Sequence, residues 1–201
     1  MMRTPCTILI SLLVLASGCL DLGSEPPAAR CVEGNCIDGK GKLEIQEGSY
    51  VGEFRNGLPA GQGELFFKEV RIYKGSFRHG LFYGKGEYFF ADGSRYVGDF
   101  LQGHFHGKGN LDLKTGSSYD GEFRNGLYHG RGVYVYLDGA RYSGEFRNGK
   151  PDGIGLFESS RGGYMKGRFV QGELDGSAEV YVPGEGKLEG EFSRGRLKRL
   201  L

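Results

Sequence analysis

The chain has 201 residues, of which 38 are glycine and 26 are aromatic, with 12 Tyr and 14 Phe. The glycines do not fall at every third position and there are only 6 prolines, which excludes a collagen-like helix, and the aromatic content excludes a wholly disordered chain. Because 26 Lys and Arg residues balance 25 Asp and Glu residues, we expect no nucleic-acid partner.

The first segment has the pattern of an export signal. Arg3 supplies a positive charge, and residues 8–16 (ILISLLVLA) form an apolar run of nine residues. This run is too short to span a bilayer, which takes about 20 residues. It ends in small residues at positions 16–18. The pattern predicts a signal peptide over residues 1–18.

The residue that follows is Cys19, and residues 15–19 (LASGC) resemble the lipobox of bacterial lipoproteins, although Ala16 stands where that pattern most often has leucine. The resemblance implies that Cys19 is acylated and anchors the chain in the bacterial cell envelope, since more than one acyl chain gives stable attachment. Leu20 then favours the outer membrane where the organism has one. The alternative is an ordinary cleaved signal followed by an incidental cysteine.

The next segment, residues 19–35, contains Pro26-Pro27 and small residues without an apolar period, which predicts a lipid-anchored flexible tether. Cys6 leaves with the signal and Cys19 is acylated, so Cys31 and Cys36 remain. In an exported protein this pair is most simply a disulfide that attaches the tether to the first strand.

A period of 23 residues governs the rest of the chain. Tyrosine recurs at positions 50, 73, 96, 119 and 142, and Met165 and Leu188 continue the register. In all seven units phenylalanine follows four positions later, and glycine follows two and seven positions later. Such a period indicates a repeat array, in which each unit buries its apolar face against its neighbours.

The unit from Tyr119 to Arg141 (YDGEFRNGLYHGRGVYVYLDGAR) closely resembles the MORN repeat. The resemblance covers residues 50–187 as six repeats and continues into a partial seventh. A degenerate half-repeat precedes them at residues 38–43. It implies that residues 36–201 form one MORN-repeat β-array.

The alternation of Tyr50, Gly52 and Phe54 with polar or exposed positions has the period of two that predicts a strand. Asn56-Gly57 then favours a hairpin turn, because both residues readily take a positive φ. We therefore expect an all-β fold, an elongated single-sheet array of antiparallel β-hairpins. The glycine between each Tyr and Phe should leave room for the stacked rings.

The search for catalytic groups finds none. Residues 103–109 (GHFHGKG) superficially suggest a phosphate loop, but only three residues separate Gly103 from Gly107, and Gly109 stands where Ser or Thr is required. Glutamates 53, 122, 145 and 191 lie near the arginines at positions 55, 124 and 147, which favours exposed cross-strand ion pairs over catalytic carboxylates. We expect no enzyme and no cofactor.

Histidine and aspartate share one repeat position, at His106, His129, Asp152 and Asp175. Neighbours in this column should lie about 10 Å apart, since each repeat contributes two strands. A metal ion needs ligands at about 2.0–2.2 Å. We therefore expect a solvated loop edge and no metal site.

Apolar residues also occur on the face opposite the Tyr and Phe ladder, at Val51, Phe66, Phe89 and Val97. Exposed apolar surface often marks a contact site, so these residues are the candidate surface for a protein partner or for self-association. The alternative is that a single-layer sheet simply leaves such side chains uncovered.

The C-terminal residues 193–201 carry four basic side chains, Arg194, Arg196, Lys198 and Arg199. They either bind anionic phospholipid or cap the last strand. The first functional hypothesis is a membrane-anchored, non-enzymatic scaffold that binds proteins. The alternatives are a phospholipid-headgroup module, as the family resemblance implies, or a noncatalytic accessory to a lipid kinase.

Overall fold

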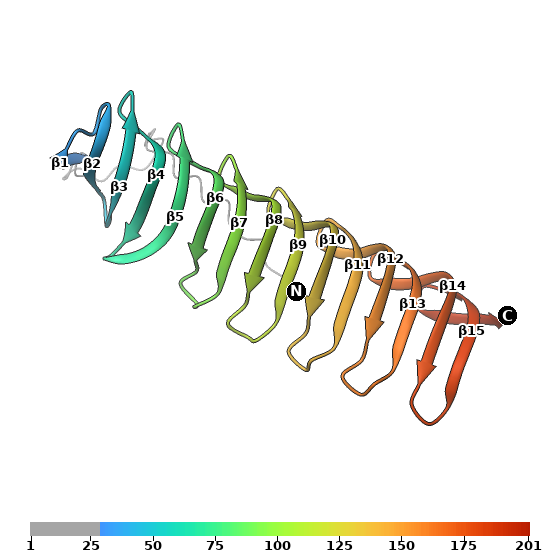
Figure 1. Cartoon of the computed structure of the whole chain (residues 1–201). Helices are drawn as coiled ribbons and strands as arrows, with labels where there is room; N and C mark the ends of the chain where they lie inside the picture. The colour runs from blue at the N-terminus through green and yellow to red at the C-terminus, as the bar shows by residue number, and fades with distance from the viewer. Residues whose placement is uncertain (1–28) are drawn as a thin grey trace, which may run out of the picture. The chain divides into compact units, whose positions relative to one another are not determined.

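The computed structural model describes residues 29–201, and these form β-strands with no helix. The strands make one antiparallel sheet in which each strand pairs with its neighbours in the chain (Figure 1). They are β1 (Arg30–Gly34), β2 (Gly39–Ile45), β3 (Gly48–Arg55), β4 (Leu58–Phe67), β5 (Val70–Arg78), β6 (Leu81–Phe89), β7 (Arg95–Leu101), β8 (His104–Asp112), β9 (Ser118–Arg124), β10 (Leu127–Val135), β11 (Arg141–Arg147), β12 (Lys150–Glu158), β13 (Tyr164–Val170), β14 (Glu173–Val182), β15 (Gly186–Ser193) and β16 (Arg196–Leu200). The predicted all-β, single-sheet fold of hairpins with a 23-residue period is confirmed.

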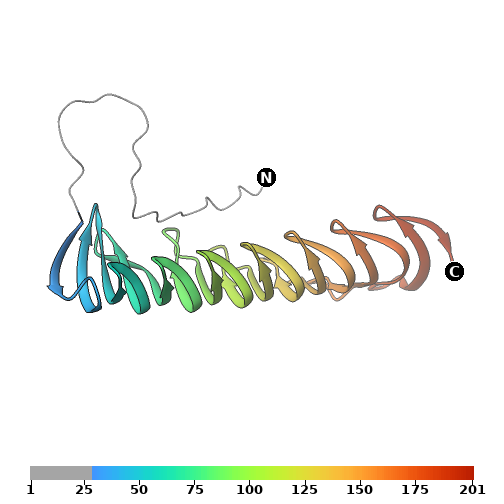
Figure 2. The same cartoon turned by 90° about the horizontal axis from the view of Figure 1, so that it is seen from above.

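The described residues divide into two compact units, one of residues 29–91 and 97–104 and the other of residues 92–96 and 105–201. Within each unit the strands are bent, as the view from above shows (Figure 2). Register shifts accompany the bends. In the second unit, for example, the pairing of β9 with β10 shifts between His129 and Gly132, and such a bulge bends a strand locally.

Each repeat turns at a two-residue loop in which both residues have positive φ. Asn125 has φ 51° and Gly126 has φ 81°, the conformation of a type I′ hairpin turn. The same loop places residues of quite different chemistry at the first position, including His79 and Gln102. The turn therefore depends on the glycine at its second position and tolerates different residues at the first, in agreement with the hairpin turn that the sequence predicts.

The core is a set of aromatic rings stacked from repeat to repeat. The Tyr119 ring lies edge-on to Phe123 and to Phe146 of the following repeat, with centroids 5.1 Å apart in both pairs. It also stacks on Tyr128 at 3.9 Å. Each such pair contributes about 0.5–1.5 kcal/mol beyond the burial of its area. Five tyrosines are 2% or less exposed: Tyr50, Tyr73, Tyr96, Tyr119 and Tyr142.

A further column of the core was not predicted. It runs through the second strand of each repeat, and where its residue is aromatic it stacks on the tyrosine, as Phe82 does on Tyr73 and Phe105 on Tyr96, with centroids 3.8 Å apart in both pairs. Its members recur at the 23-residue period: Pro59, Phe82, Phe105, Tyr128, Pro151 and Leu174. The mixture of proline, aromatic and leucine hides this column from a search for one residue type.

Paired glycines lie beneath the tyrosine rings, where the sequence predicts free space. Gly121 of β9 is opposite Gly132 of β10, and Gly132 is in turn opposite Gly144 of β11. A Cβ atom on Gly132 would lie 2.6 Å from Cζ of Tyr119. The ring thus occupies the space that a side chain on the glycine would need.

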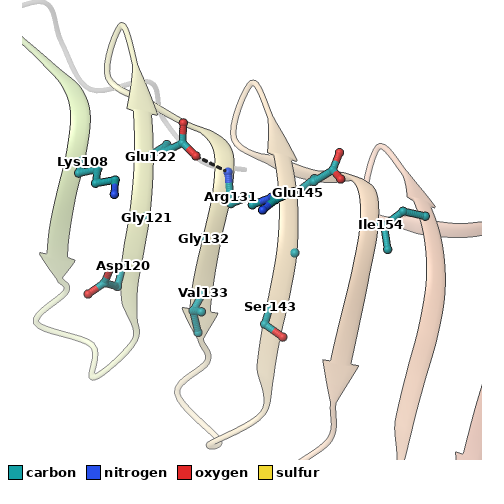
Figure 3. A pocket seen from close by; sticks show the side chains of 11 residues that line it. Lys108, Asp120, Gly121, Glu122, Arg131, Gly132, Val133, Ser143, Glu145 and Ile154 are labelled. Atoms are coloured by element: carbon teal, nitrogen blue, oxygen red, sulfur yellow. Dashed lines mark hydrogen bonds between the residues drawn. The ribbon is translucent and has the colours of Figure 1, made fainter.

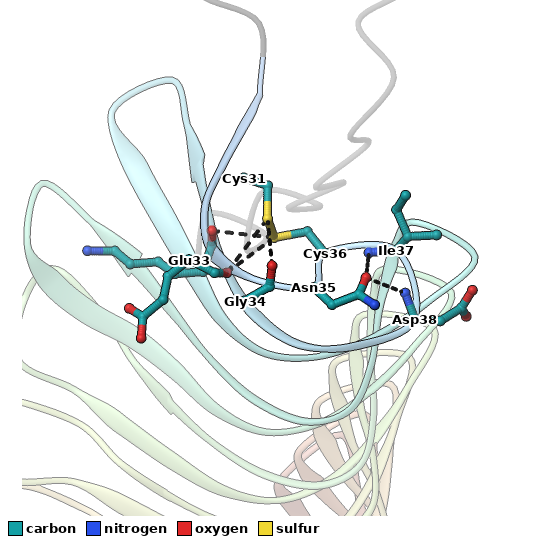
Figure 4. The surroundings of a disulfide bond; sticks show 8 residues. Cys31, Glu33, Gly34, Asn35, Cys36, Ile37 and Asp38 are labelled. Atoms are coloured by element: carbon teal, nitrogen blue, oxygen red, sulfur yellow. Dashed lines mark hydrogen bonds between the residues drawn. A yellow bond between two sulfur atoms is a disulfide. The ribbon is translucent and has the colours of Figure 1, made fainter.

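The first strand includes residues that the sequence assigns to the flexible tether. Arg30–Gly34 pair with β2 as β1, so the part of residues 19–35 after residue 29 is a strand. A disulfide joins Cys31 to Cys36 across the turn that follows, with their Cα atoms 5.9 Å apart (Figure 4). The Asn35 side chain completes this turn by accepting hydrogen bonds from the amides of Ile37 and Asp38, each at 3.0 Å.

Candidate functional site

The face of the sheet opposite the tyrosine and phenylalanine side chains is called the groove face here. No helix or second sheet covers it within residues 29–201. Side chains on it come from strand positions one residue away from the core positions, since successive residues of a strand point to opposite faces.

In the second unit this face contains a groove of about 800 Å³ (Figure 3). The backbone of Gly121, Gly132 and Gly144 lies along its centre, between two rows of side chains that run across the strands. One row consists of Lys108, Glu122, Arg131, Glu145 and Ile154, and the other of Asp120, Val133 and Ser143.

Opposite charges face one another in the first row. Lys108 of β8 is opposite Glu122 of β9, and Arg131 of β10 is opposite Glu145 of β11. Such cross-strand pairs contribute roughly 0.2–1 kcal/mol each. With two cations and three carboxylates, Asp120 included, the lining has a formal charge of 2 − 3 = −1.

The groove becomes apolar toward β12. Ile154 is 62% exposed, although other repeats place polar or charged residues at its position, namely Gln62, Lys85, Lys108, Arg131 and Ser177. Val133 lies opposite the small Ser143, and Ser143 lies opposite Leu156. The alternation along β10 and β12 places Val133 and Leu156 on this face as well, but the sequence gives no reason to single out Ile154, whose exposure only the structure shows.

The partner surface predicted from the sequence lies on the groove face of the first unit. Val51 and Val97 are 42% and 40% exposed, whereas Phe66 and Phe89 are half-buried. The Arg71 guanidinium lies 5.2 Å from the centroid of the Phe89 ring, and Arg71 is also opposite Phe66 in the pairing of β4 with β5. A cation therefore lies against the Phe89 ring and is paired across the strands with Phe66, which the sequence interpretation did not foresee.

Charges also separate Val51 from these rings. Glu64 lies opposite Val51 and forms ion pairs with Arg71 at 3.3 Å and Lys74 at 3.2 Å. Partial burial acts to raise the pKa of Glu64, but hydrogen bonds from Lys74 and Arg71 outweigh it and hold that pKa below its usual range. This surface is mixed and not a continuous apolar patch.

The C-terminal basic residues belong to a segment that covers the edge of β15 with one more strand. Arg196–Leu200 pair with β15 as β16. Arg194, Arg196 and Lys198 line a depression of about 540 Å³ together with Glu173 and Ser193. Arg199 is instead opposite Glu191 in the strand pairing. The structure thus brings together three of the four predicted basic residues.

Within the column of histidines and aspartates, the aspartates stabilise hairpin turns, whereas Nδ1 of His106 and of His129 is buried without a hydrogen-bond partner, so these two histidines do not form the expected solvated edge. Asp152 accepts hydrogen bonds from the backbone and side-chain amides of Gln171, at 3.3 and 3.0 Å. The backbone bond lowers the pKa of Asp152. Asp175 accepts one from the Arg194 amide at 3.1 Å. No group of three metal-ligating side chains occurs within residues 29–201.

Two of the four glutamates expected in ion pairs with arginine, Glu53 and Glu122, accept hydrogen bonds from the backbone instead, and Glu191 accepts one from the Ser177 hydroxyl. Glu122 accepts a hydrogen bond from the Arg131 amide at 3.0 Å, and Glu53 accepts one from the Gln62 amide at 3.2 Å. The bulged glycine before each amide brings the carboxylate and the N–H together. Arg147 forms its ion pair with Asp152, at 3.5 Å.

Two further predictions concern membrane attachment. Cys19 and the predicted signal peptide lie outside the described residues. Within residues 29–201 there is no helix long and apolar enough to cross a membrane.

Comparison with known proteins gives one family. The model of the MORN repeat matches residues 50–68, 73–95, 96–118, 119–141 and 142–164, together more than half of the chain. Among solved structures, the chain is similar to the TCP domain of SAS-4 (dCPAP) from Drosophila melanogaster, determined in complex with a proline-rich motif of Ana2 (dSTIL). The TM-score is 0.48 with 9% identity, over 89% of this chain and 99% of that chain. No curated protein matches the sequence.

Proposed function

Because the chain belongs to the MORN repeat family, we propose that it is a non-enzymatic scaffold that binds a protein partner on its groove face and is held at a membrane by an acylated Cys19. The observation that carries this proposal is the groove of the second unit, a depression of about 800 Å³ on the face that no other layer covers in residues 29–201.

The groove lining favours binding over catalysis. Ser143 supplies the hydroxyl among its lining side chains, and no base is hydrogen-bonded to that hydroxyl in the described part of the chain. Activation of a serine nucleophile requires such a base. Glu122 is engaged by a backbone amide, which suits a structural role in the groove wall.

The partner surface extends, in this proposal, to the groove face of the first unit. Val51 and Val97 supply exposed apolar area there, and the Phe89 ring lies against the Arg71 guanidinium. Arginine and aromatic side chains together are typical of protein interfaces. The experiment below distinguishes a different protein from a second copy of the chain as the partner.

Photo-crosslinking in the producing cell tests the scaffold function. A photoreactive amino acid replaces Ser143 or Val97 on the groove face. Two matched positions, Asn148 in a hairpin turn and Val182 at the end of β14, serve as controls. We expect one protein to be captured from the groove positions and not from the controls, with its mass distinguishing a partner from a second copy. Equal capture at all four positions, or none at the groove, would reject the proposal.

Membrane attachment rests on the resemblance of residues 15–19 to a lipobox. The proposed location is the bacterial cell envelope, with the outer membrane favoured by Leu20. Radiolabelled palmitate should enter the protein in growing cells, and Cys19→Ser should abolish both the label and membrane sedimentation. Unchanged sedimentation of the unlabelled variant would remove Cys19 as the anchor.

A second candidate function is the binding of phospholipid headgroups, favoured by the three cations that line the C-terminal depression, Arg194, Arg196 and Lys198. Flotation of the unlipidated chain, residues 20–201, with anionic and neutral vesicles tests it. Flotation with anionic vesicles alone, weakened by salt, would support headgroup binding, and absence of flotation would reject it.

A further inference from the structure

The groove of the second unit has a charge polarity along the sheet. Two acidic residues, Asp120 and Glu122, project from β9, and both line the groove. Two basic residues, Lys166 and Arg168, lie at the corresponding positions of β13, next to the residues that line the groove and opposite Leu156 and Ile154 of β12. On the other side of β13, Lys166 is opposite Glu179, whose carboxylate forms an ion pair with Lys187 at 2.7 Å. Strand β11, which carries Ser143, is midway between β9 and β13 in the strand order.

Between these charged residues, the groove has an apolar site that fits an apolar side chain of a ligand. Ser143 is small, and it lies between Val133 and Leu156 in the strand pairing. Ile154 borders the same apolar site and is 62% exposed. The remaining charges of the central strands, Arg131 and Glu145, are opposite one another and offset each other.

The distances between the acidic pair, the apolar site at Ser143 and the basic pair favour one backbone conformation of a bound peptide. Neighbouring strands are about 4.8 Å apart, so the step from β9 to β11, and again from β11 to β13, is about 9.6 Å. A polyproline II helix has three residues per turn and rises about 3.1 Å per residue, which gives about 9.3 Å per turn. Every third side chain of such a segment would therefore meet one of the three features in turn.

Other backbone conformations fit less well. In an extended β-strand, residues three apart point to opposite faces. A ligand that crosses the strands also finds no free strand edge in the groove with which to pair. An α-helix is about 10–12 Å wide, whereas the two rows of side chains are separated by two residues of a strand, about 7 Å. Polyproline II needs no backbone partner.

We propose that this groove binds a proline-rich segment of a protein partner that carries a basic, an apolar and an acidic residue at every third position. The basic side chain lies over Asp120 and Glu122, the apolar one over Ser143 and Ile154, and the acidic one over Lys166 and Arg168. The positions of the basic and acidic residues in the segment determine its chain direction. A segment with the basic residue first runs from β9 to β13, and one with the acidic residue first runs from β13 to β9. This inference rests on the proposed scaffold function and adds the chemistry of the partner.

Fluorescence anisotropy with short labelled peptides and the full chain tests the proposal. The probe is Lys-Pro-Pro-Leu-Pro-Pro-Glu. The comparison peptides replace Leu by Ser, or carry the same charge at both ends. We expect the probe to bind best and the Ser peptide to bind about tenfold more weakly or worse, as the loss of a buried apolar anchor implies. Equal binding of all peptides, or no binding of the probe at millimolar concentration, would overturn the proposal.

Variants of the chain give the matched test. Ile154→Lys should weaken probe binding about tenfold without unfolding the sheet, because Lys85 and Lys108 occupy the same repeat position. Val182→Lys, at an exposed position at the end of β14 and outside the groove lining, is the control and should leave binding unchanged. The double variant Lys166→Glu with Arg168→Glu should come to prefer the peptide with lysine at both ends. Retention of the original preference would contradict the assigned orientation.

The two proposals fail in different ways. If photo-crosslinking at Ser143 captures a protein but the probe peptide does not bind, the scaffold function stands and the proline-rich chemistry is wrong. If the groove positions capture nothing, the scaffold function itself is rejected. Binding of the probe that Ile154→Lys leaves unchanged would place the ligand outside this groove.

Discussion

Tyr119 and Gly132 form one structural element although they belong to different strands. The phenol ring of Tyr119 on β9 covers the Cα of Gly132 on β10, so closely that a Cβ atom there would lie 2.6 Å from Cζ of the ring. The Tyr119 hydroxyl donates a hydrogen bond to the Glu122 carbonyl oxygen at 2.9 Å. This bond fixes the ring in place, so the ring cannot move aside for a larger residue at position 132.

Replacement of Gly132 by alanine should therefore destabilise the sheet. Insertion of a methyl group into a close-packed site costs typically 1–3 kcal/mol, and the contact falls on a buried ring. We expect Gly132→Ala to lower the free energy of unfolding by about this amount, as measured by urea denaturation followed by circular dichroism.

A double-mutant cycle supplies the control for this prediction. Tyr119→Leu removes the ring and should itself destabilise the chain. In its background, Gly132→Ala should cost less than in the native chain, because the clash is gone. An additive result would show that the alanine acts on the backbone and not through the Tyr119 ring.

The hairpin turns predict a contrast between two neighbouring residues. Asn125 and Gly126 both have positive φ, 51° and 81°, but other repeats place His79 or Gln102 at the first position and always glycine at the second. Gly126→Ala should cost about 1–2 kcal/mol, the penalty for a left-handed conformation in a residue with a Cβ. Asn125→Gln should lower the free energy of unfolding by only about a few tenths of a kcal/mol, since other repeats have glutamine at this position. Equal effects in urea denaturation would contradict this account of the turn.

The sequence sufficed for the fold because the strongest features of the structure repeat. Tyrosine, phenylalanine and both glycines recur in register, and their contacts lie within one repeat, as for Tyr119 and Phe123, or between neighbouring repeats, as for Tyr119 and Phe146. The period of 23 residues thus determines the strand pairing as well as the strands. The column of Phe82 and Tyr128 was missed because its residue type changes from repeat to repeat.

The candidate site was harder to predict because it depends on differences between repeats. Ile154 makes the groove apolar at this point because it replaces the polar residue that other repeats have at the same position. Arg71 lies against Phe89 through a register shift between Leu65 and Phe66 that the sequence pattern does not encode. The Glu122 carboxylate reaches the Arg131 amide only because the strand bulges there. The repeat period alone therefore predicts neither the bulges nor the single residues that differ from the repeat pattern.

The buried tyrosines predict that the fold weakens in alkali. Burial raises the pKa of Tyr142 to about 12 and raises those of Tyr50, Tyr73, Tyr119 and Tyr128 as well, from about 10 in the unfolded chain. Above pH 10 the unfolded state therefore binds fewer protons than the folded state, so the free energy of unfolding falls as pH rises toward 12.

Absorbance of tyrosinate and circular dichroism, recorded together from pH 9 to pH 12, check this prediction. Part of the tyrosinate signal should appear only as the sheet signal is lost. Complete ionisation of the tyrosines near pH 10 with an intact sheet spectrum would show that these hydroxyls are accessible to solvent.

The disulfide predicts a local effect at the start of the sheet. Cys31 and Cys36 are five positions apart, and the stabilisation that a disulfide gives by restricting the unfolded chain decreases with loop length, from about 3 kcal/mol for a 15-residue loop. Cys31→Ser with Cys36→Ser should therefore lower global stability by less than this, while hydrogen exchange speeds up in β1. Strands β9 to β12 should keep their protection, because each is hydrogen-bonded to its neighbours in the strand order, whereas β1 is hydrogen-bonded to β2. Loss of protection along the second unit would instead show that the sheet unfolds cooperatively from its first strand.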